Sequence, residues 1–316
     1  MAAKNKVQFQ KGLSLVQFIA DYGTNQQCRE ALFYLRWPQG FICPKCGHTD
    51  YYEIKARKIY ECCLCHQQTS VTSGTIFADT KLGLNIWFLG IYLITQSKDG
   101  ISSLKLARTL GISANAALRM KHKLQHVMKE REESKPLSGF IQVDDAYIGG
   151  KSRGGKRGRG ASGKTPFLAA VTTTEKGRPI SMKLSQVSGF SKHEITQWAG
   201  KHLSPGSIVV TDGCNCFPGL QQAGCSHQTI ITGGGPDSVN IPEFKWVNTM
   251  IGNVKTAIRG TCHAISKKHV PRYLAEFCYR FNRRFDLGKM ISRLIYIAVR
   301  TAPMPKYLLQ LPEIRW

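Results

Sequence analysis

Two pairs of cysteines near the start of the chain restrict its fold more than any other feature. The pairs are Cys43-x-x-Cys46 and, after fifteen intervening residues, Cys62-x-x-Cys65. Two such turns present four thiolates to one tetrahedral zinc ion, and a site with four cysteine ligands keeps no open position for catalysis. The spacing therefore predicts one structural Zn²⁺ in a zinc ribbon over residues 39–72, with short β-hairpins between the turns. Cys63 falls outside the spacing, and we expect its thiol to be free.

The charge of the chain indicates a polyanionic partner. The chain contains 44 Lys and Arg against 20 Asp and Glu, which gives a formal net charge of +24. Such an excess favours nucleic acid or an anionic membrane. No segment reaches the roughly 18 apolar residues of a membrane helix, and the N-terminus lacks the apolar core of a signal peptide. We therefore expect a cytoplasmic protein that binds nucleic acid, either as an enzyme or as a structural binder, and no membrane.

Helical patterns surround the ribbon on both sides. Residues 1–38 are expected to form an N-terminal helical segment. Residues 73–133 form a second helical region, in which Ala107, Gly111 and Ser113 match a helix-turn-helix whose Ser caps the next helix.

The helix that follows this turn carries basic side chains suited to DNA, namely Arg119, Lys121 and Lys123. The alternative is a plain helical hairpin with a solvated basic face. A charged stretch with Pro136 and Gly139 then reads as a linker to the last domain.

From residue 138 to residue 316 the pattern changes to alternating strands and helices. Strands are predicted at 139–149, 165–175, 178–188, 207–212 and 227–232, and helices at 192–203, at 216–224 and from Trp246 onwards. This order is that of a mixed α/β, ribonuclease-H-like catalytic domain. Its first three strands form an antiparallel meander, and its later crossovers add parallel strands.

Polar candidates stand at the three places where this fold carries its chemistry. Asp144 lies in the first strand, Asp212 ends the fourth, and Asn248 lies near the start of a late helix. Neighbouring residues of a strand face opposite sides of a sheet, so only one of Asp144 and Asp145 joins Asp212 on a given face. The pattern alone does not decide which.

Several motifs taken in order resemble the zinc-ribbon insertion-sequence transposases of the ISXO type. They are "FICPKCG", "YECCLCHQQTSVTSGTIF", "VDDAYIGGK", "IVVTDG" and "GTCHAISKKHVPRYLAEFCYRFNRR", and they span residues from about 30 to 300. Relatives read "VDETYIGG" at the first acidic site, where the Asp is a metal ligand. The resemblance implies that Asp144 and Asp212 are ligands of catalytic Mg²⁺ or Mn²⁺, in a two-ion site.

The third ligand departs from the commonest pattern of these relatives. Many carry Glu, followed seven residues later by Lys or Arg on the same helix face, whereas some carry Asn. Counting back from "GTCH", the resemblance places Asn248 as third ligand and Lys255 as its basic partner. Asn253 is the first competitor, but it lies about 140° round the helix from Asn248. Glu243 is the second, in a stretch that reads as a Pro-containing loop.

Two further groups of basic residues are candidates for DNA contacts. The Gly-rich tract at 149–164 carries Lys151, Arg153, Lys156, Arg157 and Arg159. It can follow a phosphate backbone, or it can be a solvated hairpin tip.

The late helix carries Glu276, Arg280 and Arg283 on one face. The alternative there is a surface ladder of ion pairs. The resemblance suggests a signature of the Asn-bearing subgroup near the active site or the DNA end. The remaining cysteines lack metal-binding spacing, apart from Cys214-x-Cys216, and we expect no metal at them.

Three functions are consistent with these patterns, and only the resemblance to the transposases favours the first over the second. The first is a DNA transposase that binds the terminal inverted repeats of its element as a homo-oligomer on double-stranded DNA and performs two-metal-ion cleavage and strand transfer. The second is a ribonuclease-H-like nuclease or resolvase that does not join strands. The third is a non-catalytic zinc-ribbon DNA-binding protein, against which the intact catalytic set argues.

Overall fold

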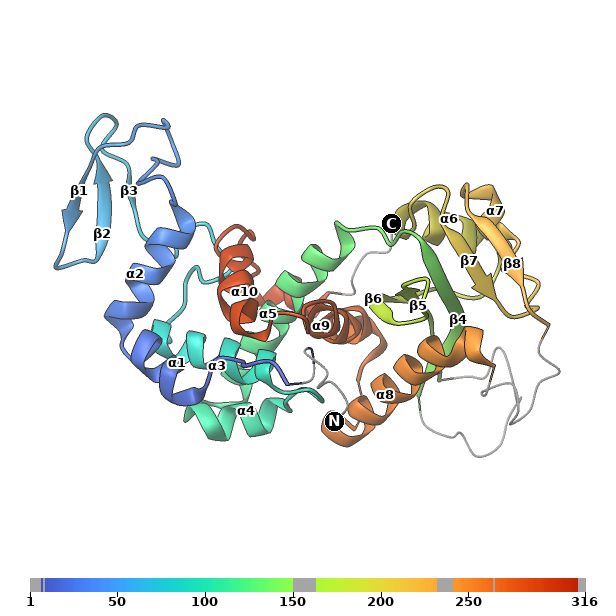
Figure 1. The fold of residues 1–316 in the computed structure, drawn as a ribbon. Coiled ribbons are helices and arrows are strands. Elements are labelled where there is room, and N and C mark those ends of the chain that lie inside the picture. Colours follow the sequence, from blue (N-terminus) through green and yellow to red (C-terminus); the bar gives the residue numbers. More distant parts are fainter. Residues whose placement is uncertain (1–6, 8, 150–162, 232–240, 264, 312–316) are drawn as a thin grey trace. The chain divides into compact units, whose positions relative to one another are not determined.

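The computed structural model describes residues 7, 9–149, 163–231, 241–263 and 265–311 (Figure 1). The chain forms two compact units, one of residues 1–127 with 284–311 and one of residues 128–283. The first unit thus includes helices that follow the catalytic core in sequence. The functional division into four domains at residues 38, 72 and 133 stays a prediction. Among the described residues, no helix is both long and apolar enough to span a bilayer.

The first unit begins with two short helices and a small sheet. Helices α1 (Leu15–Tyr22) and α2 (Asn25–Arg36) precede strands β1 (Tyr51–Ile54), β2 (Ile59–Cys62) and β3 (Gln68–Thr69). The three strands form an antiparallel sheet in the order β1-β2-β3. Aromatic rings join α2 to this sheet, since the ring of Phe33 lies 5.1 Å from those of Trp37 and Tyr60. The ribbon is therefore held by an aromatic cluster as well as by its cysteines.

A helical bundle completes the first unit. It contains α3 (Leu84–Gln96), α4 (Ser103–Leu110), most of α5 (Ala114–Glu133), α10 (Met290–Ala298) and α11 (Lys306–Gln310), with the 3-10 turn η4 (Leu287–Lys289). Helix α4 ends at Gly111, whose φ of 65° is left-handed, a conformation that glycine adopts at little cost. The Ser113 hydroxyl accepts the Ala116 N–H at 3.2 Å and caps α5. The turn and its Ser cap are as the sequence predicts.

The second unit is built on one five-stranded sheet. Its strands are β4 (Phe140–Ile148), β5 (Thr165–Thr173), β6 (Pro179–Gln186), β7 (Ile208–Thr211) and β8 (Ser226–Thr229), in the order β6-β5-β4-β7-β8. Strands β4, β5 and β6 form an antiparallel meander, whereas β7 is parallel to β4 and β8 is parallel to β7. This is the predicted ribonuclease-H-like order, with β4 at the centre.

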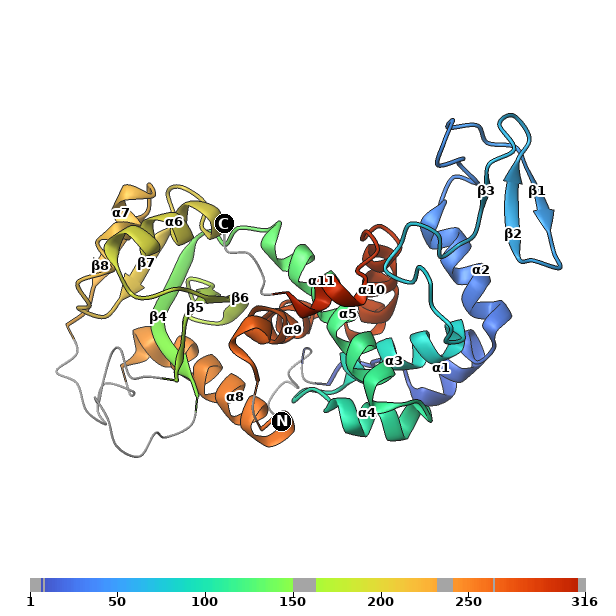
Figure 2. The same cartoon turned by 180° about the vertical axis from the view of Figure 1, so that it is seen from behind.

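Helices cover both faces of the second sheet (Figure 2). On one face, α6 (Lys192–His202) and α7 (Gly219–Gln222) pack on side chains such as Ile141 and Val143. On the other face, α8 (Lys245–Thr261) and α9 (Val270–Asn282) pack on residues such as Ala146. A 3-10 turn precedes each of these helices, η2 (Pro242–Phe244) before α8 and η3 (Lys267–His269) before α9. The alternation along β4 therefore assigns its even-numbered residues near the acidic pair to the α8 face.

Strand β6 is an edge of this sheet, and α9 covers it. The Met182 N–H donates to the Asn282 side-chain carbonyl at 2.7 Å, and the Asn282 amide donates to the Met182 C=O at 3.0 Å. The Asn282 side chain thereby imitates a neighbouring strand. Such capping leaves these backbone groups unavailable to another chain.

Candidate active site

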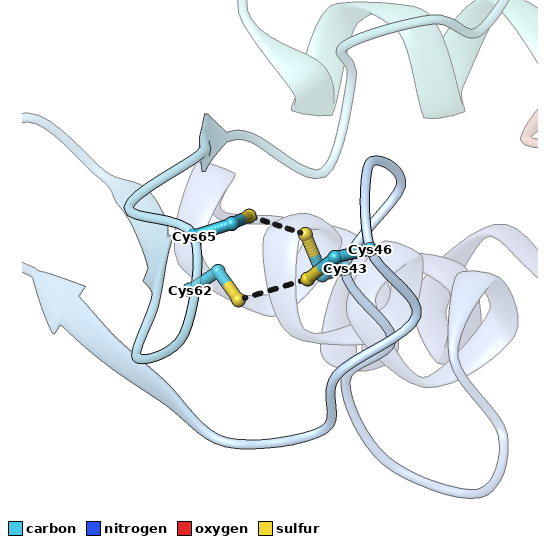
Figure 3. Close-up of side chains that lie close together, drawn as sticks. All are labelled: Cys43, Cys46, Cys62 and Cys65. Atoms are coloured by element: carbon cyan, nitrogen blue, oxygen red, sulfur yellow. Dashed lines mark hydrogen bonds between the residues drawn. The ribbon is translucent and has the colours of Figure 1, made fainter.

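The zinc-ribbon cysteines converge as their spacing predicts (Figure 3). The Sγ atoms of Cys43 and Cys65 are 3.6 Å apart, and those of Cys46 and Cys62 are 3.5 Å apart. All four ligand atoms lie within 4.8 Å of one another. Tetrahedral zinc with bonds of about 2.3 Å separates its sulfur ligands by about 3.8 Å. The donor set therefore fits zinc, and Cys63 is not part of it.

Both cysteine turns have the same backbone form. Each closes with an N–H that donates to the carbonyl of the first cysteine at 3.0 Å, from Gly47 in the first turn and from His66 in the second. Gly47 and His66 both adopt a positive φ, of 77° and 56°. The two turns can thus present paired thiols from opposite sides of one centre.

The acidic pair on β4 divides between the two faces of the sheet. Val143 contributes to the cluster under α6 and α7, and Ala146 to the cluster under α8 and α9. By alternation, Asp144 faces the side of α8 and Asp145 faces the side of α6. The Asp145 N–H donates to Asp144 Oδ1 at 2.8 Å. The face that carries Asp144 is the one on which the helix with Asn248 packs.

Asp144 lies in an unfavourable environment for a carboxylate. Its pKa is raised to about 7, first by burial and then by the charge of Asp145, with a further contribution from Asp212. Lys255 opposes this rise. Three of the four predicted catalytic residues, Asp144, Asp212 and Lys255, are therefore close enough to interact electrostatically. A divalent cation would relieve this repulsion between carboxylates.

Asp212 follows the last residue of β7 and is partly buried. Its Oδ1 accepts the Cys214 N–H at 3.1 Å. Atoms of Asp145, Asp212 and Cys214 also lie within 4.8 Å of one another. The sequence analysis expects no metal at Cys214, whereas the structure places its thiol beside these two carboxylates.

Helix α8 is anchored to the strand that carries Asp144. Gln142 Oε1 accepts the N–H groups of Trp246 at 3.0 Å and of Val247 at 3.1 Å. Gln142 is two residues from Asp144 and therefore on the same face of β4. It caps the first turn of α8, whose flanking residue Phe244 makes no side-chain cap. Sequence reasoning missed this residue, because a polar side chain in a buried strand has no partner visible in the pattern.

On α8, Asn248 is partly buried, whereas Asn253 and Lys255 are exposed. Asn248 and Lys255 are seven residues apart, so they share a face. The pKa of the Lys255 ammonium lies below its usual range, chiefly through desolvation, while Asp144 opposes the shift. The competitor Glu243 is exposed and belongs to η2, a 3-10 turn, where a loop was expected.

The predicted DNA-contacting residues of α5 are placed differently from one another. Arg119 is exposed. Lys121 is only 1% exposed and donates to the Ile101 carbonyl at 2.6 Å. Lys123 is partly buried and donates to the Ile76 carbonyl at 2.9 Å. Both ammonium groups bond to backbone carbonyls within the first unit, so this structure does not favour the prediction that they contact DNA.

Arg280 and Arg283 are also not on an open surface. Arg280 is buried and pairs with Glu276, which is 2% exposed. Arg283 is partly buried, pairs with Glu132 and stacks over the Tyr279 ring. Neither the predicted DNA contact nor a surface ladder describes these pairs, because this face of α9 is buried. Lys151, Arg153, Lys156, Arg157 and Arg159 lie outside the described residues.

Comparison with known families identifies the two parts of the chain. A model described as an ISXO2-like transposase domain matches residues 136–282, and a transposase zinc-ribbon domain matches residues 23–68. Together they cover more than half of the chain. The chain belongs to the ISXO2-like transposase family. It is a DNA transposase, a phosphoryl-transfer enzyme with a zinc ribbon and a DDE-type domain, which confirms the resemblance drawn from the motifs.

A curated relative agrees with this family. The chain is 23% identical over 283 residues to an uncharacterized protein in transposable element ISH50 of Halobacterium salinarum, with 83% of this chain and 92% of that protein covered.

Similarity to solved structures is weak. For the catalytic core of BIV integrase the identity is 14%, with 44% of this chain and 82% of that chain covered and a TM-score of 0.27. For a pre-cleavage Mos1 transpososome the identity is 10%, with 63% and 77% covered and a TM-score of 0.21. Scores this low carry no argument about the fold, and the ribonuclease-H-like description of the second unit rests on its own strand order.

Proposed function

We propose that this transposase cleaves double-stranded DNA at the terminal inverted repeats of its element and joins the freed ends to a target. Asp144, Asp212 and Asn248 are the metal-binding set, and Lys255 is the basic partner. One observation carries this proposal: Asp144 faces the side of β4 on which α8 packs, and Asp212 follows the end of β7, the parallel neighbour of β4. Two divalent ions, Mg²⁺ or Mn²⁺, would activate the attacking oxygen and stabilise the leaving oxygen when bound.

Each side chain of this set has a role suited to its chemistry. The two carboxylates supply charged oxygen donors, and the Asn248 amide supplies a neutral carbonyl oxygen that cannot act as a base. Lys255, an exposed residue, offers its ammonium to a DNA phosphate. Gln142 positions Asn248 and Lys255 by fixing the start of their helix to β4.

DNA recognition is assigned mainly to the N-terminal part of the chain. Arg119 lies on an exposed face of α5, the second helix of the helix-turn-helix. The basic tract at 151–159 is proposed to follow phosphates near the active site. Lys121, Lys123, Arg280 and Arg283 are left out of the proposed contact set, since they bond within the protein. A homo-oligomer on DNA is proposed because the two ends of an element must be joined together.

The catalytic set is tested by Mn²⁺-dependent cleavage of an end-bearing duplex. We expect Asp144→Ala and Asp212→Ala to abolish cleavage while leaving DNA binding intact, because each removes a charged ligand. Asn248→Ala should also be severe, whereas the matched control Asn253→Ala should be mild. Full cleavage by Asn248→Ala, with loss in Asn253→Ala or Glu243→Ala, would overturn the assignment of the third ligand.

Joining is tested separately from cleavage. A pre-cleaved end with a free 3′-hydroxyl is mixed with a supercoiled plasmid, and covalent insertion products are measured. A transposase should insert the end, and Asp144→Ala should not. Cleavage without any insertion would favour the nuclease or resolvase function.

A further inference from the structure

A second group of metal donors lies beside Asp212, and it contains sulfur. Asp145, Asp212 and Cys214 each offer an atom within 4.8 Å of the other two, and all three are partly buried. The Sγ of Cys216 lies 3.2 Å from that of Cys214. The group of three thus joins two carboxylates and one thiol, and the Cys216 thiol lies next to that of Cys214.

The fold produces this group from two neighbouring strands. Asp145 points to the α6 and α7 face by the alternation of β4. Parallel β7 ends at Thr211, so Asp212 and the following turn lie beyond the end of that strand. Cys216 is buried in the cluster under α6 and α7, and Cys214 packs against the same cluster. Asp145 and both thiols therefore belong to one side of the sheet, and Asp212 stands at its edge.

The donor set is suited to a different cation from the one expected in catalysis. Mg²⁺ binds oxygen donors in octahedral geometry, whereas thiolates favour Zn²⁺ and other soft ions. Tetrahedral zinc with bonds of 2.0–2.3 Å separates its ligand atoms by about 3.3–3.8 Å. Atoms already within 4.8 Å reach those separations by small side-chain rotations.

We propose that Asp145, Asp212 and Cys214 bind a thiophilic divalent cation, Zn²⁺, at a site separate from the zinc ribbon. Asp212 is shared with the proposed catalytic set. A cation bound through Cys214 therefore withdraws Asp212 from Asp144 and inhibits strand cleavage. The inhibition rests on the proposed function, whereas the binding does not.

Cobalt is the probe for binding. Full-length protein with zinc in its ribbon is titrated with Co²⁺ in the presence of a phosphine reductant, and thiolate-to-cobalt absorption is recorded. We expect one further equivalent of Co²⁺ with thiolate and tetrahedral bands. Cys214→Ser should remove the thiolate band and weaken binding more than about tenfold, since even outer-sphere changes at metal sites cost 10–100-fold. Asp145→Asn should weaken binding without removing the band.

Cys225→Ala is the matched control, because Cys225 is a buried thiol of the same cluster outside the donor set. It should leave the cobalt spectrum unchanged. The proposal is overturned if Cys214→Ser keeps both the thiolate band and the affinity, or if the unaltered protein binds no Co²⁺ beyond its ribbon. If Cys214→Ser and Asp145→Asn both weaken the binding of Co²⁺, misfolding of a single variant does not explain the loss.

Inhibition is measured in the Mg²⁺-dependent cleavage assay. Added Zn²⁺ should inhibit the unaltered protein, and Cys214→Ser should need at least about tenfold more Zn²⁺ for the same fractional loss of its own zinc-free rate. Equal zinc sensitivity would remove the inhibitory role while leaving the binding result in place. If no variant cleaves DNA, the proposed function fails and the cobalt titration still decides the site.

Discussion

Gln142 offers the most direct test of how the fold positions the catalytic helix. Its side chain is 8% exposed, and its Oε1 accepts two N–H groups in the first turn of α8. Gln142→Met keeps the length and apolar bulk of the side chain but removes the acceptor. The N–H of Val247, a buried residue, is then left without its partner. Loss of a helix cap costs about 0.5–2 kcal/mol, and each unpaired buried group costs about 1–3 kcal/mol.

We therefore expect Gln142→Met to lower the free energy of unfolding of the second unit by about 2–3 kcal/mol. Amide exchange at Trp246 and Val247 should accelerate, because these are the two donors that lose their acceptor. Gln142→Glu keeps an acceptor at a helix N-terminus, where a negative charge is favourable. It should retain most of the stability, although it adds a third carboxylate near Asp144.

The measurements are urea unfolding and hydrogen exchange, with Gln228→Met on the edge strand β8 as control. Gln228 is exposed, so its replacement should change stability by less than about 0.5 kcal/mol. Cleavage by Gln142→Met should fall even under conditions where the protein stays folded, since α8 carries Asn248. An unfolding free energy within about 0.5 kcal/mol of the unaltered protein, with unchanged amide exchange, would refute the capping role.

Three further predictions concern zinc, pH and the sheet edge. Cys62→Ser should release the ribbon zinc, measured with a chromogenic chelator, whereas Cys63→Ser should not; equal release would contradict the ligand assignment. His202 is buried, which lowers its pKa to about 3, so the unfolded state binds a proton that the folded state does not. Stability should therefore be full above pH 6.5 and fall by about 1.4 kcal/mol between pH 7.5 and 5.5, a loss that His202→Gln removes in urea unfolding. Asn282→Ala should expose Met182 at the β6 edge, lower the unfolding free energy by about 1–3 kcal/mol and increase aggregation by light scattering; an unchanged melting curve would exclude the cap.

Local patterns predicted local structure well. The spacing of the ribbon cysteines predicts a group that the structure brings within 4.8 Å. Gly111 and Ser113 mark the end of one helix and the cap of the next, as observed. The order of strands and helices predicts the topology of the second sheet. These features depend on turn residues and on hydrophobic alternation, and both can be recognised in short segments of the sequence.

Tertiary burial was less predictable. Lys121 and Arg280 read as basic residues on helix surfaces, yet both are buried, one bonding to a carbonyl and the other to a carboxylate. Helical periodicity reports which residues share a face but not whether a second element covers that face. The partners lie at different distances in sequence, since Ile101 is 20 residues from Lys121 and Glu276 is 4 residues from Arg280.

The two adjacent aspartates of β4 show how one strand can serve two sets of donors. Alternation sends Asp144 to the helix with Asn248 and Asp145 to the turn with Cys214. Asp212 follows the last residue of β7, so strand alternation does not assign its side chain to one face of the sheet. It interacts with both aspartates. The proposed ligands of the first set are all oxygen donors, whereas a thiol joins the second set. The type of ligand atom in each set, oxygen or sulfur, should therefore decide which cation each position prefers.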